Sequence, residues 1–126
     1  MRVAVTLLVG LFLVGNGGFM LLAPAIWYET VPGVTGTGPL NVHFVRDIGA
    51  AYLVSGIAPL WLAADRRAWP AALIGAGFLG LHGMIHLVEW LGGHGHGHLA
   101  TDLPGVWLPP LALLWLGWPR HATKET

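Results

Sequence analysis

The residues from Val3 to Leu22 form an almost uninterrupted apolar run. A helix of about 20 residues, each rising 1.5 Å, spans the hydrocarbon core of a bilayer, which is roughly 30 Å thick. Backbone groups inside a bilayer must satisfy one another, and a helix does this within a single segment. We therefore expect a membrane helix over residues 3–22.

A cleaved signal peptide is the alternative interpretation of this run. Arg2 precedes it, and Ala23-Pro24-Ala25 has the small-x-small form of a signal cleavage site. The run is long for the apolar region of a signal peptide, which has about 7–15 residues. We therefore predict an uncleaved helix.

The composition supports a membrane protein over the whole chain. The 126 residues are 55% hydrophobic and 10% charged, whereas roughly a quarter of the residues in a soluble domain are charged. The formal net charge is zero, which predicts no nucleic-acid surface. The chain has no cysteine, so disulfides and thiolate metal sites are excluded. We expect one transmembrane domain over residues 1–126.

Further apolar segments complete the predicted fold, an all-α integral membrane four-helix bundle. The other three helices are predicted over residues 41–64, 71–91 and 106–118. Glycine, proline and histidine mark two outer loops, over residues 23–40 and 92–105. Pro109-Pro110 removes amide donors from the fourth segment, so we expect an irregular turn followed by a short helix from about Pro109.

Basic residues predict the orientation of the bundle. On one side of a four-helix arrangement fall Arg2, Arg66, Arg67, Arg120 and Lys124. Basic residues concentrate on the cytoplasmic side of a membrane, so we expect both termini to be cytoplasmic. Candidate anchors at this interface are Trp61, Trp69, Trp115 and Trp118. The use of Arg, Ala and Gly in place of Lys and Ile suggests a GC-rich bacterial genome. Together with the apolar helices, this predicts a bacterial inner (plasma) membrane protein.

Two of the predicted helices carry ionisable residues. These are His43, Arg46 and Asp47 on the second helix, and His82, His86 and Glu89 on the third. A charge at the bilayer centre costs about 2.5–3.5 kcal/mol on insertion scales, so such groups usually face a partner, a metal or a water-filled cavity.

The third helix places its ionisable residues on one face. At 100° per residue, His82, His86 and Glu89 lie within an arc of about 60°. Two histidines four positions apart can ligate one metal, as they do in His-Glu-x-x-His helices. The order here is His-x-x-x-His-x-x-Glu, so that hydrolase motif is not matched. His43 and Asp47 share a face of the second helix in the same way.

Because antiparallel helices bring both sets to a similar depth, we predict a single metal site near the outer face. Its proposed ligands are His43, Asp47, His82, His86 and Glu89. Nitrogen and oxygen ligands of this kind suit zinc, copper or iron. Haem held by His43 and His86 is less favoured. Two interpretations need no metal: a structural network, in which Arg46 pairs with Asp47 or Glu89, and a proton or substrate path.

Two predicted outer segments hold accessory candidates. His94, His96 and His98 alternate with glycine, a composition typical of metal capture or of a plain solvated loop. Glu29 lies in a stretch whose turn residues suggest a folded cap over the bundle. Taken alone, Glu29 is a surface carboxylate.

Two short motifs carry a resemblance to a known family. They are Trp-Tyr-x-x-Val-Pro-Gly from Trp27 and His-x-x-Arg-Asp from His43. With the four-helix layout, they resemble the small DoxX-like bacterial membrane proteins. Many members of that group have no established activity, so the resemblance implies the fold more than the function.

The leading functional hypothesis is a small inner-membrane metal-binding protein with a redox or metal-handling role. The alternative is an accessory subunit of a larger membrane complex or homo-oligomer, since the chain is rich in tryptophan and its fourth helix is short. A third hypothesis is an enzyme that acts on a lipid or quinone, with histidines and carboxylates as acid and base.

Overall fold

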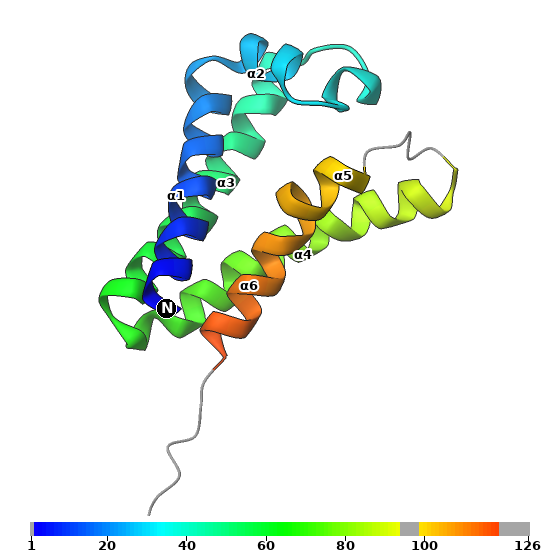
Figure 1. Ribbon diagram of the computed structural model, residues 1–126. Helices are drawn as coiled ribbons and strands as arrows, with labels where there is room; N and C mark the ends of the chain where they lie inside the picture. The colour runs from blue at the N-terminus through cyan, green and yellow to red at the C-terminus, as the bar shows by residue number, and fades with distance from the viewer. Residues whose placement is uncertain (1, 94–98, 119–126) are drawn as a thin grey trace, which may run out of the picture.

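The computed structural model describes residues 2–93 and 99–118. Over these residues the chain is helical and has no strand. The helices are α1 (Arg2–Leu22), α2 (Pro24–Thr30), α3 (Val42–Ala64), α4 (Trp69–Leu91), α5 (Leu99–Asp102) and α6 (Leu108–Gly117). Between them lie two 3-10 turns and one π-helical turn: η1 (Val34–Thr37), η2 (Arg66–Ala68) and η3 (Leu103–Trp107) (Figure 1).

The predicted all-α class is confirmed, and the described chain has three segments long and apolar enough to cross a membrane. They are α1, α3 and the continuous stretch from η2 through α4, Arg66–Leu91. These spans make the chain a membrane protein by length and composition. α6 has 10 residues, half of the roughly 20 that a membrane helix needs.

Helix starts follow local capping groups. The Asn41 side chain accepts a hydrogen bond from the Phe44 backbone N–H at 3.1 Å and so begins α3. The Asp65 carboxylate accepts from the Arg67 N–H at 2.9 Å. This bond tightens η2, which lets α4 begin at Trp69, two residues before its predicted start, with Pro70 in its first turn.

Both predicted loops are helical over part of their length, which differs from the prediction. In the first, Pro24 opens α2, because proline suits the first turn of a helix. The indole N–H of Trp27 donates to the Asn16 side-chain oxygen at 2.9 Å and ties α2 to α1. In the second, α5 and η3 precede α6, so the irregular turn before the short fourth helix is a π-helical one.

Glycines let α1 and α3 pack closely along their length (Figure 1). A Cβ on Gly17 would lie 2.6 Å from the Gly49 carbonyl oxygen, and one on Gly56 would lie 2.7 Å from the Val14 nitrogen. No side chain fits at such distances, so the two backbones contact each other directly. Gly49 and Gly56 therefore lie at the interface between α3 and α1.

The second helix pair, α4 with α6, diverges from the first. Figure 1 shows the two pairs meeting at the end where α1 begins and separating toward α2 and α5. A buried cluster with members from all four helices joins them: Leu13, Met20, Val45, Tyr52, Ala76, Leu79 and Leu113. The fold therefore resembles a V whose arms are helix pairs.

Candidate functional site

Two histidines of α4 and a carboxylate of α5 form the main polar group between the helices. The rings of His82 and His86 have centroids 4.9 Å apart. His86 Nδ1 lies 3.3 Å from Asp102 Oδ2. The His86 and Asp102 side chains are 28% and 25% exposed, so the protein shields most of their surface. We call these three residues the α4–α5 cluster.

Aromatic rings enclose His82. Tyr52 of α3 meets the His82 ring edge-on, with centroids 5.8 Å apart. Phe78, one turn earlier on α4, stacks on the same ring at 6.4 Å with an interplanar angle of 13°. Since Tyr52 is buried, His82 lies at the contact between the two arms and its ring orientation is set by packing.

The turn η3 holds Asp102 against α4. A Cβ on Gly83 would lie 3.7 Å from a Val106 methyl group and 3.8 Å from the Trp107 ring. These are ordinary van der Waals distances, so η3 packs on the turn of α4 that carries His82 and His86. Asp102 immediately precedes η3 and is thereby brought to His86.

Asp102 was missed in the sequence, because residues 92–105 were interpreted as one loop. A signal was present: Asp102 is the one acidic residue between Glu89 and Glu125. An isolated carboxylate next to an apolar segment, and after two unpaired histidines, is a candidate partner for one of them. Tyr52 was also missed, because nothing in the sequence marks which face of α3 meets α4.

His43 and Asp47 form a separate pair on α3. His43 Nε2 lies 3.4 Å from Asp47 Oδ2, and the two side chains are 88% and 60% exposed. At 100° per residue they point about 180° away from the buried residues Val45, Gly49 and Tyr52. We call them the α3 pair. They face the outside of the V, which is why the five predicted ligands do not converge.

The remaining predicted residues are not part of the cluster. Glu89 and Glu29 are exposed near the ends of α4 and α2. Arg46 Nε donates to the Leu21 carbonyl at 3.2 Å, at the end of α1. His94, His96 and His98 lie outside the described residues. Among residues 2–93 and 99–118, no three or more His, Asp or Glu side chains are grouped closely enough to hold one metal ion.

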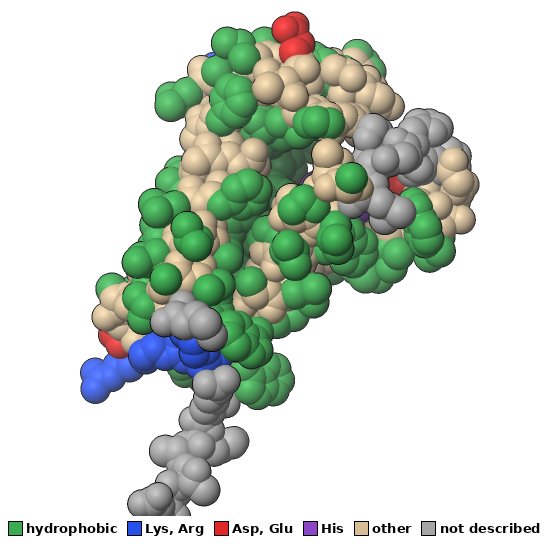
Figure 2. Space-filling model, in the orientation of Figure 1, with side chains coloured by type: hydrophobic (Ala, Val, Ile, Leu, Met, Phe, Trp, Pro, Cys, Tyr) green, Lys and Arg blue, Asp and Glu red, His purple; other side chains and the backbone are tan. Residues whose placement is uncertain are grey.

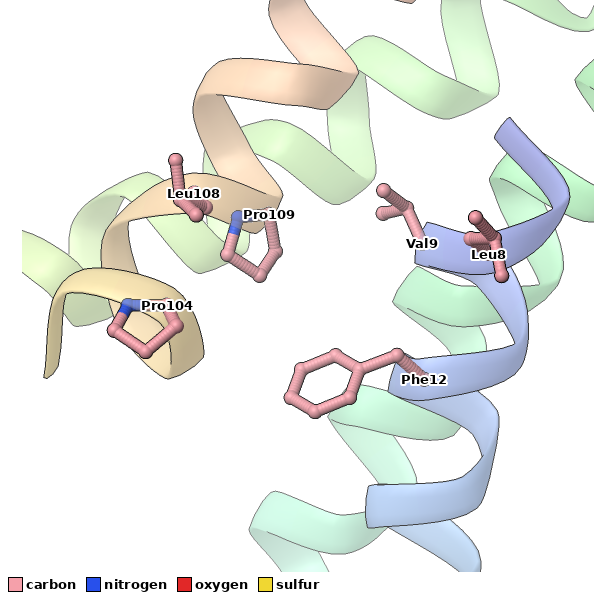
Figure 3. Close-up of a pocket in the computed structure, with 6 residues that line it drawn as sticks. All are labelled: Leu8, Val9, Phe12, Pro104, Leu108 and Pro109. Atoms are coloured by element: carbon pink, nitrogen blue, oxygen red, sulfur yellow. The ribbon is translucent and has the colours of Figure 1, made fainter. Parts of the chain in front are cut away.

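A shallow apolar pocket lies between the arms of the V (Figure 3). Its volume is about 320 Å³. One wall comes from α1 and the other from η3 and α6, and Figure 3 shows Phe12 directed across the gap. The lining residues are Leu8, Val9, Phe12, Pro104, Leu108 and Pro109. The lining offers no ionisable group, so the pocket suits an apolar chain.

Comparison with protein-family models, curated proteins and solved structures finds no match to this chain. The functional interpretation therefore rests on the chemistry of the α4–α5 cluster.

The cluster has the arrangement that histidine ligands of metals usually have. A metal-bound histidine commonly donates its second ring N–H to a carboxylate, which fixes the tautomer and raises the basicity of the ligating nitrogen. His86 with Asp102 matches this arrangement, because the contact is made by Nδ1 and Nε2 remains available. Imidazole nitrogens suit zinc, copper and iron.

Proposed function

We propose that the protein binds a transition-metal ion in a bacterial inner membrane, with His82 and His86 as ligands. The observation that carries this proposal is the 3.3 Å contact between His86 Nδ1 and Asp102, beside a second imidazole on the next turn of the same helix. Two protein ligands leave coordination positions open, which suits metal handling or redox chemistry more than a closed structural site.

Haem fits this geometry less well than a bare ion. His82 and His86 lie one turn apart on one helix, so they cannot occupy the two opposite axial positions of one haem. The other predicted axial ligand, His43, faces away from the arm that carries His86. We therefore expect purified, metal-loaded protein to lack the absorbance band of haem.

The proposed topology has four spans, with η3 and α6 together as the fourth and both termini in the cytoplasm. Its support is the contact between Arg2 and the Trp115 carbonyl, which brings the start of α1 to the end of α6. Basic residues collect on cytoplasmic faces, so the α4–α5 cluster would lie toward the outer face. The DoxX-like resemblance agrees with this layout and remains a prediction.

Metal content of detergent-purified protein tests the proposal. The reference protein for this test, called the parent below, is the triple variant His94→Ala, His96→Ala, His98→Ala. These substitutions prevent the Gly-His segment from contributing bound metal. We expect the double variant His82→Ala, His86→Ala to lose most of the bound metal. His43→Ala, which removes the histidine of α3, should keep it.

The two histidine variants must retain the helical circular dichroism of the parent. Equal metal content in the parent and the double variant would contradict the proposal. Loss of metal in His43→Ala alone would place the site on α3 instead.

The second candidate function is an accessory subunit of a larger membrane complex. The apolar pocket between the arms favours it, because an apolar side chain or helix from a partner would bury Phe12 there. Copurification from the native membrane in mild detergent tests it. Phe12→Ala should reduce the recovery of a defined partner and His86→Ala should not. A stable, monodisperse isolated protein counts against this function.

A further inference from the structure

Arginine side chains gather at the end of the molecule where the two arms meet. Arg2 begins α1, and Arg66 and Arg67 lie in η2 between α3 and α4. Figure 2 shows the blue side chains together at this end, beside an acidic group. We call these three residues the arginine end. It lies at the opposite end of the described chain from α2 and the α4–α5 cluster.

The C-terminal carbonyls of α6 hold two of these arginines in place. Arg2 Nη2 donates to the Trp115 carbonyl at 2.9 Å, and its guanidinium lies 4.6 Å above the Trp115 ring. Both Nη atoms of Arg66 lie 3.4 Å from the next carbonyl, that of Leu116. Neighbouring carbonyls thus bring two guanidinium groups together. Arg66 retains N–H donors beyond these two, because a guanidinium has five.

Arg67 adds an exposed charge to the same end. Its backbone N–H, and not its guanidinium, makes the hydrogen bond to Asp65. The side chain is exposed. A substitution at Arg67 therefore removes a charge without removing the contacts that join η2 to α6.

Four tryptophans lie in the helix segments next to the arginine end. The indoles at the end of α3, the start of α4 and the end of α6 are exposed on the protein surface: Trp61 57%, Trp69 37%, Trp115 50% and Trp118 64%. Tryptophan is enriched where hydrocarbon meets the lipid headgroups. Exposed indoles at this end therefore favour a position of the arginines at headgroup level.

We infer that the arginine end binds the phosphate of an anionic phospholipid. Guanidinium groups bind phosphate through paired, charge-assisted N–H bonds. The indoles beside them and the apolar helix faces beyond suit the acyl chains of a lipid, which a free phosphate lacks. A lipid bound here would contact α1, η2 and α6 at once, and so would stabilise the junction of the two arms.

Lipid titration of the full-length protein in detergent micelles tests this inference. The probes are phosphatidylglycerol and phosphatidylcholine, with binding measured by native mass spectrometry. We expect phosphatidylglycerol to bind several-fold more tightly. Arg67→Gln should lower its affinity about fivefold, the effect of one basic residue at an anionic surface. Arg46→Gln, at the other end of the molecule, is the matched control and should leave the affinity unchanged.

Three results would overturn the inference. They are equal affinity for the two lipids, an equal loss in Arg46→Gln and Arg67→Gln, and displacement of phosphatidylglycerol by millimolar inorganic phosphate. The last would assign the site to a free anion. The experiment is independent of the metal proposal, because the double variant His82→Ala, His86→Ala should bind both lipids as the parent does.

Discussion

The α3 pair and the contact between His86 and Asp102 are two histidine–carboxylate contacts of almost equal length, 3.4 and 3.3 Å. Their surroundings differ. The α3 pair is 88% and 60% exposed, and its members lie one turn apart on one helix. His86 and Asp102 are about three-quarters covered and come from two helices.

This difference shows that a short distance between a histidine and a carboxylate does not identify a functional site. The α3 pair needs only a helix, because residues four positions apart are neighbours on any helix. The contact between His86 and Asp102 needs η3 packed on α4, so the whole arm must fold before it forms. A contact that requires tertiary structure and is largely shielded from water is the better candidate for a site.

The largest expected difference between the two pairs is in metal affinity. Asp102→Asn removes the charge that polarises His86, and loss of such a partner typically lowers metal affinity by about 10–100-fold. Asp47→Asn should leave affinity unchanged. Competition with a chromophoric chelator, using zinc or cobalt, measures both constants. An equal loss in the two variants would remove the distinction between the pairs.

Stability should show the next largest difference. Asp102→Ala leaves His86 Nδ1 without its partner in a partly covered position, and we expect a loss of about 1–3 kcal/mol in the free energy of unfolding. Asp47→Ala should change it by less than about 0.5 kcal/mol, as at most exposed positions. Unfolding of metal-free protein in detergent, followed by circular dichroism, gives both values. Equal losses of unfolding free energy in Asp102→Ala and Asp47→Ala would show that the difference in burial does not make the two contacts differ in stability.

The smallest expected effect is the coupling within the α3 pair. A double-mutant cycle over His43→Ala and Asp47→Ala should give a coupling energy below about 0.5 kcal/mol, because solvent screens exposed ion pairs. Added salt should reduce it further. The corresponding cycle over His86 and Asp102 should give a larger coupling that salt changes less. A larger coupling at the α3 pair would reverse the comparison.

Much of the local structure was predictable from the sequence. α1 and α3 begin and end within one residue of their predicted limits. Apolar length, the Asn41 cap and Pro70 are local signals, so they act wherever the chain places them. The shared face of His82 and His86 was also predictable, since helix geometry alone determines it.

The partners of those residues were not predictable in the same way. Apolar residues occur on every face of α3, so no apolar stripe shows which side meets α4. The prediction therefore placed the α3 pair on the face of α3 that meets α4. In the structure the pair lies on the opposite, exposed face. The position of Asp102 next to α4 was not predictable, because its helix α5 has four residues. A helix of that length is too short to show a periodic pattern in the sequence.

The sequence by itself determined a helical membrane chain and two histidines on one face of α4. Tertiary structure decided which polar groups meet. In a soluble protein, a helix is polar on the face that contacts water and apolar on the face that contacts the core, so the sequence shows which face is buried. In a membrane, lipid and protein interior are both apolar, so the sequence does not show which helix face is buried. The packing of η3 on α4 decided that His86 meets the carboxylate of Asp102 and not one from α3.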